Sequence, residues 1–285
     1  MNVRIIPRLD IKGPNLVKGI HFEGLRVLGK PEHYARFYYE SGADELYYQD
    51  AVASLYGRNS LLEIIRKTSK EIFIPLCVGG GLRSIDDIRE VLRAGADKVA
   101  INTSVIHDPN LIAKASRVFG SSTIVVAIEA VRNGDSKYEC CIDYGRELTG
   151  LDAIGWAAKA VDLGAGELLV TSIDREGTGE GYDLDLIRNI AELVPVPVIA
   201  GGGCGKIDHV SEVIKSGKAD AVCMASILHY TILENGQLGC TENDFETEGN
   251  TVFLNSKKSF TKVGNGTLRE IKERMSELGI SCRMD

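Results

Sequence analysis

The chain has 285 residues, 44% of them hydrophobic, and a formal net charge of −7. This length can bury one large core, and the negative balance without a long Lys or Arg cluster argues against a nucleic-acid surface. No segment has the layout of a signal peptide or the length of a membrane span, so we expect a cytoplasmic protein. Seven cysteines, an odd number without a Cys-x-x-Cys pair, indicate reduced thiols. The five histidines are scattered and show no metal-ligand spacing. We therefore predict no metal site and no cofactor.

Short apolar segments alternate with amphipathic ones along the whole chain. The continuous β-branched runs are typical of parallel strands that are buried on both faces. In the first half we predict strands at 3–9, 45–49, 72–78 and 98–101, and helices at 32–41, 59–70, 84–93 and 109–119. In the second half we predict strands at 123–128, 167–173, 196–200 and 221–225, and helices at 152–163, 184–193, 207–216 and from 267 onward. Eight strands, each followed by room for a helix, predict a single (β/α)8 barrel spanning 1–285.

Four segments depart from this rhythm. Residues 11–31 are too glycine-rich for a helix, and we expect a long loop that acts as a lid. Within it, Lys18 is either a cation for a bound substrate or a solvated lysine. Residues 133–144 are expected to form a small polar hairpin, 174–182 a glycine-rich loop, and 230–263 an inserted rim segment. Thr267 with Glu270 three residues later has the spacing of a capping box.

Several phrases recur at a nearly constant offset. The glycine triplet at 79–81 returns at 201–203, 122 residues later, and Gly42-Ala-Asp-Glu returns as Gly164-Ala-Gly-Glu at the same offset. The repeat predicts two homologous half-barrels, about 1–120 and 121–285.

Each triplet ends a strand, so backbone N–H groups can gather around an anion there. Tight turns alone would also explain one triplet, but the duplication favours a ligand with a phosphate at each end. We predict Gly80, Gly81, Asn102 and Thr103 at one phosphate, and Gly202, Gly203, Ala225 and Ser226 at the other.

Two carboxyl groups are predicted to face each other across the barrel mouth. Asp10 follows strand one and Glu129 follows strand five, and active residues of such barrels lie at the C-terminal ends of strands. Such a pair can divide proton donation from proton abstraction, although solvated rim carboxylates are the alternative. Asp50 and Ser172 fall at the same end of the barrel.

A second charged group is predicted at the opposite end. Arg4, Glu45, Lys98 and Glu167 occupy strand starts, and strand alternation lets all four point inward. Two acids and two bases would neutralise each other in a ring. From the residues alone, this ring is either a structural plug or a gate.

These motifs together resemble the HisF family, the cyclase subunits of imidazole glycerol phosphate synthase. The resemblance rests on Arg4-Ile-Ile-Pro, Asp97-Lys98-Val-Ala-Ile-Asn102-Thr103, Thr171-Ser-Ile-Asp-Arg-Glu-Gly177-Thr178 and both glycine triplets, and covers nearly all of the chain except 230–263. It implies a bisphosphate substrate at the mouth and ammonia from a HisH-like glutaminase. It also implies an ammonia gate at Arg4, Glu45, Lys98 and Glu167, and a partner contact at Asp97. Substrate contacts are implied for Lys18, Asp50, Ser172 and Glu176, and a phosphate contact for Gly177.

Three positions depart from the family pattern. Glu129 stands where the family has its second catalytic aspartate, Arg8 replaces a small residue on strand one, and Glu176 replaces an aspartate. The residues of the gate are retained, whereas residues at the catalytic end of the barrel are altered. This combination favours a HisF-like paralogue of the WbuZ type, which supplies ammonia to a sugar amidotransferase of surface-polysaccharide synthesis. A genuine cyclase of histidine biosynthesis is the alternative. The related isomerase HisA fits less well, because it needs no ammonia.

Overall fold

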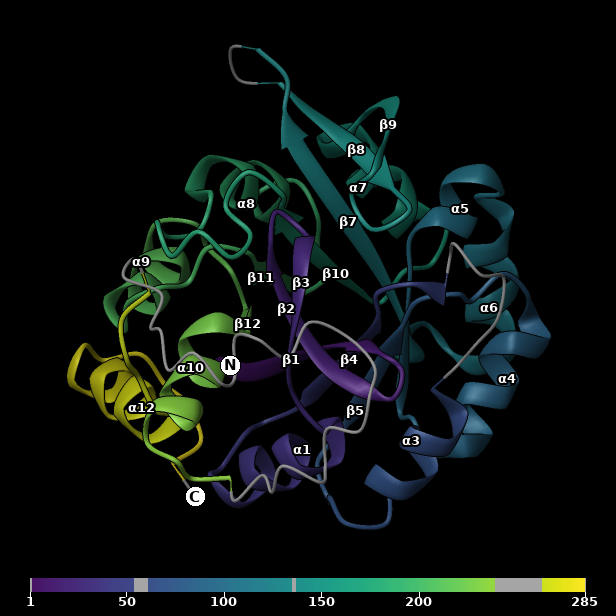
Figure 1. Ribbon diagram of the computed structural model, residues 1–285. Coiled ribbons are helices and arrows are strands. Elements are labelled where there is room, and N and C mark those ends of the chain that lie inside the picture. Colours follow the sequence, from purple (N-terminus) through teal and green to yellow (C-terminus); the bar gives the residue numbers. More distant parts are fainter. Residues whose placement is uncertain (1, 54–60, 135–136, 239–262, 285) are drawn as a thin grey trace.

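Eight parallel strands close into a barrel in a computed structural model that describes residues 2–53, 61–134, 137–238 and 263–284. The closure is continuous because β10 pairs both with β7 and with β11. Helices surround the strands (Figure 1). The barrel strands are β1 (Arg4–Lys12), β4 (Leu46–Asp50), β5 (Leu76–Gly79), β6 (Lys98–Ile101), β7 (Ile124–Arg132), β10 (Glu167–Ser172), β11 (Val198–Gly201) and β12 (Ala221–Met224). The predicted (β/α)8 barrel is confirmed.

The outer layer consists of helices that pack apolar faces on the barrel. Their buried Leu, Ile, Val and Ala side chains and the outward side chains of the strands form one continuous core. The helices are α1 (Pro31–Glu40), α3 (Leu62–Thr68), α4 (Ile85–Ala94), α5 (Thr103–His107), α6 (Asn110–Phe119), α7 (Ala153–Asp162), α8 (Leu184–Ala191), α9 (Asp208–Lys215), α10 (Ser226–Glu234) and α12 (Leu268–Glu277), with a 3-10 turn η1 (Ser121–Thr123). None of these helices is long and apolar enough to cross a membrane.

A second, smaller core fills the barrel interior. It consists mainly of small and β-branched side chains, with Tyr47 as its one aromatic member. Its members are Ile6, Tyr47, Cys77, Ala100, Val125, Ala127, Leu169, Ile199, Ala221 and Cys223. This layer lies between the charged residues at the strand starts and the polar residues at the strand ends.

Two three-stranded antiparallel units rise from the barrel, one in each half. β1 continues into β2 (Asn15–Ile20) and β3 (Glu23–Gly29), and β7 continues into β8 (Tyr138–Ile142) and β9 (Glu147–Asp152). The expected irregular loop at 11–31 is therefore wrong, because the segment forms a hairpin. The hairpin expected at 133–144 is present, but it extends to Asp152.

Two helices differ from the prediction. The short helix α5 was not predicted, and the start of the expected rim insertion, 230–234, belongs to helix α10. Residues 239–262 of that insertion lie outside the described residues. The capping box of α12 is confirmed: the Glu270 N–H donates to Thr267 Oγ1 at 3.2 Å, and the Thr267 N–H donates to Glu270 Oε2 at 2.8 Å.

Candidate active site

The two predicted catalytic carboxyl groups lie where barrel strands become hairpin strands. Asp10 is opposite Gln49 of β4 on one side and Val17 of β2 on the other, and Glu129 is opposite Thr171 of β10 and Cys141 of β8. Both are therefore inside their strands rather than at the strand ends that we predicted. Both side chains are buried, with exposures of 1% and 6%.

Asp10 belongs to a network of four buried charges. Arg8 Nε donates to Asp10 Oδ1 at 2.8 Å, Lys18 Nζ lies 3.9 Å from Asp10 Oδ2, and Lys18 also pairs with Glu176. Burial lowers the pKa of Arg8 and Lys18, but the neighbouring carboxylates more than offset this, so both pKa values are raised and both groups stay cationic. Lys18 is thus an internal ion-pair member, and the alternative of a solvated lysine is wrong.

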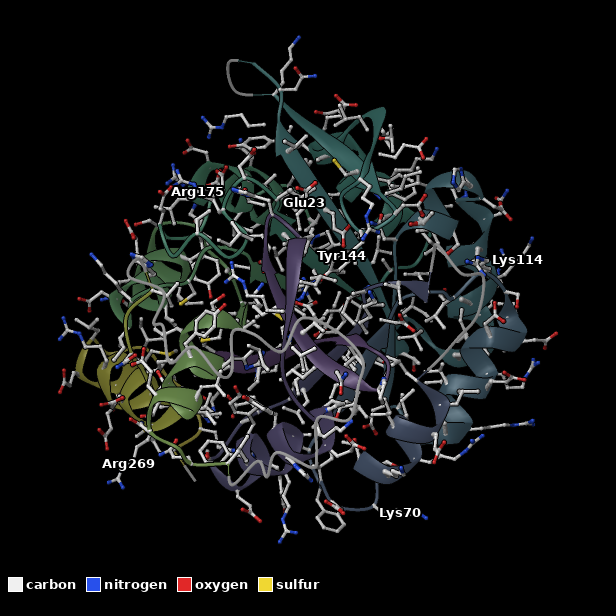
Figure 2. The ribbon with its side chains drawn as sticks, in the orientation of Figure 1. Glu23, Lys70, Lys114, Tyr144, Arg175 and Arg269 are labelled. Carbon is white, nitrogen blue, oxygen red and sulfur yellow. The ribbon has the colours of Figure 1, made fainter. Side chains whose placement is uncertain are left out.

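The Arg8 guanidinium is also enclosed by aromatic rings. Its central carbon lies 5.0 Å from the ring centroid of Phe22 and 5.5 Å from that of Tyr47, and Phe22 stacks on Tyr144 at 4.3 Å. Tyr144 lies toward the middle of the view in Figure 2, whereas Lys114 and Arg269 lie at the periphery. We call Arg8, Phe22, Tyr47 and Tyr144 the mouth plug. It joins the two hairpins above the barrel to the barrel interior.

Sequence reasoning missed the aromatic part of this plug. Phe22 and Tyr144 each occupy the second of two consecutive turn positions with positive φ, after His21 and Asp143 respectively. Turns of this kind usually contain Asn or Gly. The sequence lacks that signal at His21 and Phe22, so the first turn could not be expected; the second turn does contain a glycine, Gly145, with a φ of 77°. The meeting of the two rings could not be expected, because they come from turns far apart in the chain.

Glu129 has the environment of a proton-exchanging group. Burial raises its pKa to about 7, although the Arg8 guanidinium lowers it. Asn102 Nδ2 donates to Glu129 Oε2 at 3.3 Å and to the Cys141 carbonyl at 3.1 Å. At neutral pH this carboxyl group exists in both protonation states, as general acid–base catalysis requires.

A cavity of about 310 Å³ lies beside Glu129, between β4 and β7. Its wall contains Asp50, Gly80, Gly81, Asn102 and Thr103, all of which were predicted from the sequence. The backbone of Gly80 and Gly81 has φ values of 99° and 72°, which only glycine adopts readily. The structure thus brings this group of predicted residues together with Glu129.

The second group of predicted residues lines a much smaller space. Gly177, Gly202, Gly203, Ala225 and Ser226 surround a cavity of about 10 Å³, about the size of one water molecule, together with Arg8 and Glu176. A Cβ added to Gly203 would lie 2.1 Å from the Gly181 carbonyl oxygen, so the 177–181 loop packs directly on the glycine turn. Ser172 is buried beneath this turn, where its carbonyl lies close to Gly202.

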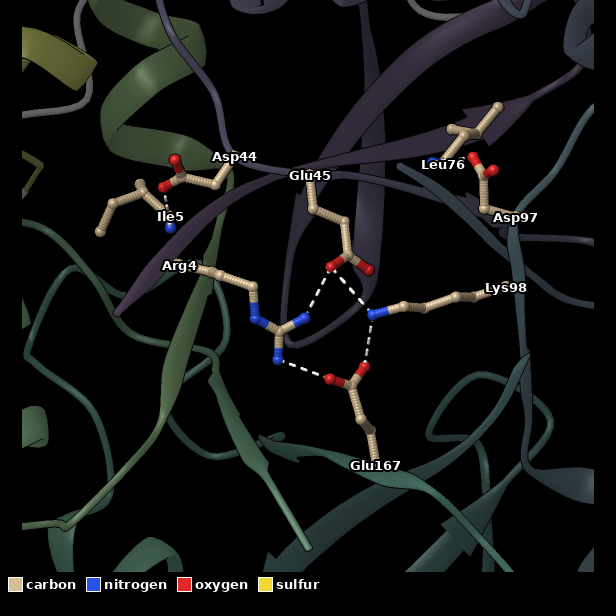
Figure 3. A network of polar contacts seen from close by, with 8 residues as sticks. All are labelled: Arg4, Ile5, Asp44, Glu45, Leu76, Asp97, Lys98 and Glu167. Atoms are coloured by element: carbon tan, nitrogen blue, oxygen red, sulfur yellow. Dashed lines mark hydrogen bonds and ion pairs between the residues drawn. The ribbon is translucent and has the colours of Figure 1, made fainter. Parts of the chain in front are cut away.

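The four charged residues at the strand starts form a closed ring (Figure 3). Arg4 bridges Glu45 and Glu167 with two contacts of 2.6 Å, and Lys98 bridges the same carboxylates at 3.1 and 2.8 Å. Burial raises the pKa of Glu45 above its ordinary value, although Lys98 and Arg4 pull it down. The predicted ring geometry is confirmed.

Asp97 is exposed at the same end of the barrel, and it also has a structural contact. Its carboxylate accepts a hydrogen bond from the Leu76 backbone N–H at 2.9 Å, as Asp220 does from Val198 in the other half.

The fold and site define a (β/α)8 barrel with a polar mouth, two glycine turns and a charged ring at the opposite end. Residues 4–234 match the model of the family described as histidine biosynthesis protein. An imidazole glycerol phosphate synthase subunit HisF from Legionella pneumophila is 56% identical over 208 residues, which cover 73% of this chain and 98% of that protein. Subunits of the same name from Methanococcus maripaludis and Methanocaldococcus jannaschii are 46% and 49% identical, over 86% and 80% of this chain and 95% and 90% of theirs. The chain belongs to the HisF family.

Proposed function

We propose that this chain is the barrel subunit of a cytoplasmic glutamine amidotransferase complex. A HisH-like glutaminase binds the end of the barrel that carries Asp97, and ammonia passes the ring of Arg4, Glu45, Lys98 and Glu167 to reach the mouth. The proposal is supported by membership of the HisF family and by the closed ring of two acids and two bases at that end of the barrel.

We propose further that the chain is a WbuZ-type paralogue whose ammonia serves a sugar amidotransferase. The observation that carries this proposal is the hydrogen bond from Arg8 Nε to Asp10 Oδ1. A carboxylate that is already paired with a buried guanidinium is a poor proton carrier, because its protonation would leave the Arg8 charge uncompensated. Cyclisation by an Asp10 and Glu129 pair is hindered for this reason.

A genuine cyclase is the second candidate, and one observation favours it. Glu129 is buried beside the larger cavity with a pKa of about 7, which suits a general acid or base. In this reading Asp10 and Glu129 act on a phosphorylated substrate held by the glycine turns, with Lys18, Asp50, Ser172 and Glu176 around it.

The experiment that separates the two candidates is turnover of the HisF substrate, phosphoribulosyl-formimino-aminoimidazole-carboxamide ribonucleotide, with excess ammonium salt. Free ammonia bypasses the glutaminase, so only the chemistry of the barrel is measured. The paralogue proposal expects no turnover by the wild type or by Glu129→Asp alone. Wild-type turnover of about 0.1 per second or more, which is within the range of ordinary enzymes, would show a working cyclase and contradict it.

A further inference from the structure

The exposed large hydrophobic side chains gather at one end of the barrel. Among the described residues, five such side chains are more than half exposed, and four of them lie at the end where the strands start: Phe73, Val118, Leu193 and Met284. The fifth, Leu148, lies on β9 at the mouth. Single exposed hydrophobic side chains are common, but four at one end of a molecule indicate a surface that another protein covers.

Two of these side chains flank the charged ring. Phe73 lies in the segment between α3 and β5, and Leu193 lies in the segment between α8 and β11. Three strands separate β5 from β11 in either direction around the barrel, so Phe73 and Leu193 lie on opposite sides of the ring. The side chains of Arg4 and Lys98 in the ring are partly exposed. A protein that contacts both flanks must therefore cover the ring.

Phe73 is the most exposed of the four side chains, and it is also held in place. Ile72 and Ile74 on either side of it are buried in the core, which directs Phe73 outward, so that its side chain is 80% exposed. Its ring meets the edge of the Tyr39 ring of α1, with 6.0 Å between the two centroids. An aromatic side chain that is fixed before binding loses little conformational freedom on binding, and a few such residues provide most of the energy of a protein interface.

The surface around Phe73 continues into the one that the proposed function assigns to the glutaminase. Asp97 directly precedes β6, which pairs with β5, so the exposed Asp97 lies on the same side of the ring as Phe73. Figure 3 shows Asp97 beside Leu76 and Lys98 at this end of the barrel. One partner can therefore contact Asp97 and Phe73 together.

We propose that Phe73 is the anchor residue of the glutaminase interface, and that this interface extends across the ring to Leu193. Phe73 enters an apolar pocket of the glutaminase, and the bound subunit covers Leu193 at the opposite edge, so the ring is closed off from solvent. The inference deepens the proposed function, because it rests on a HisH-like glutaminase at this end and names the side chains that hold it.

Titration of a HisH-like glutaminase with the full chain, followed by sedimentation and by glutamine hydrolysis, tests this proposal. Phe73→Ser should weaken the complex about thirtyfold or more. Leu193→Ser should weaken it about fivefold or more, because less apolar area is then buried. Leu148→Ser removes an exposed apolar side chain at the mouth, and this matched control should change the affinity less than about twofold.

The hydrolysis data separate an anchor from a residue that transmits a signal. At saturating concentration, the Phe73→Ser chain should support hydrolysis within about twofold of the wild-type rate, because only binding has been weakened. A lowered maximal rate with unchanged affinity would overturn the role as an anchor. The urea denaturation midpoints of all three variants should match that of the wild type, because the three side chains are exposed.

The remaining outcomes are distinguishable. Unchanged affinity of Phe73→Ser, or an equal loss for Leu148→Ser, would overturn the proposal and leave the proposed function intact. Wild-type dimers that Phe73→Ser abolishes would show that a second copy of this chain covers the surface, which also overturns it. If the wild type does not bind the glutaminase at all, the proposed function and the anchor are contradicted together.

Discussion

At the scale of single residues, the sequence predicted the charged and polar side chains of the mouth, but neither the rings of Phe22 and Tyr144 nor the way the charges pair. Alternation along the strands led us to expect that Asp10 and Glu129 point inward. It does not fix the Arg8 rotamer that brings Nε to Asp10, nor the pairing of Lys18 with Glu176 across 158 positions of the chain. These ion pairs form between side chains that come close together only once the barrel has closed, so the sequence pattern of a single strand does not determine them.

Glu129 should make the stability of the protein depend on pH. Its pKa is raised from 4.5 to about 7 in the folded chain. Between these values the folded chain keeps a proton that the unfolded chain releases, so the free energy of unfolding falls as pH rises from about 4.5 to about 7. At about 1.4 kcal/mol per pH unit the loss approaches about 3 kcal/mol, and it is constant at higher pH.

Glu129→Gln cannot ionise, so its stability relative to the wild type should rise by about 3 kcal/mol between pH 4.5 and pH 8. Urea denaturation at both pH values measures this change. Glu90→Gln, on the exposed side of α4, is the matched control. Its free energy of unfolding should differ from that of the wild type by the same small amount at pH 4.5 and at pH 8. If Glu129→Gln changes the free energy of unfolding equally at the two pH values, the raised pKa of Glu129 is contradicted.

At the scale of elements, the helices and barrel strands were predictable because their apolar periods and caps are local. At two helix starts that we predicted, a side chain caps the helix. Ser84 Oγ accepts a hydrogen bond from the Asp87 N–H, and Asp152 Oδ2 accepts one from the Gly155 N–H. The β2–β3 hairpin was missed because its two turn residues, His21 and Phe22, have positive φ without being Asn or Gly. Strand β5 is also shorter than predicted, since only 76–79 pair with the neighbouring strands.

The capping box of α12 leads to a prediction at this scale. Thr267→Ala removes the acceptor for the Glu270 N–H and should lower the free energy of unfolding by about 1 kcal/mol. Ser276→Ala, at an exposed position of the same helix, should change it by less than about 0.5 kcal/mol. Thermal or urea denaturation of both variants measures the difference. Equal stability of the two would show that the box contributes nothing.

At the scale of the whole molecule, the chain has a charged ring at one end and a plugged mouth at the other. Both halves begin with a strand that extends into an antiparallel hairpin, which adds to the repeats seen in the sequence. The division into half-barrels at about residue 120 stays a prediction. The strand register placed the ring correctly from the sequence, because each member is the first inward-facing residue at its strand start.

Breaking the ring should be costly. Lys98→Met would leave Glu45 and Glu167 facing each other with Arg4 as their one remaining ring cation, and we expect a loss of about 3 kcal/mol in the free energy of unfolding. Lys114→Met breaks only a surface pair with Asp108 and should cost less than about 1 kcal/mol. Urea denaturation at pH 7 compares the two. A loss for Lys98→Met no larger than for Lys114→Met would mean that the ring is not a coupled unit.

The measurement that tests the account most directly is association of the full chain with a HisH-like glutaminase, followed by sedimentation at pH 7 with glutamine hydrolysis measured in the same samples. We predict a one-to-one complex in which hydrolysis is faster than for the glutaminase alone by about tenfold or more. A HisF relative that binds the same glutaminase serves as the positive control. If that relative binds and this chain forms no complex at tens of micromolar, the proposed role as an ammonia-receiving subunit is contradicted.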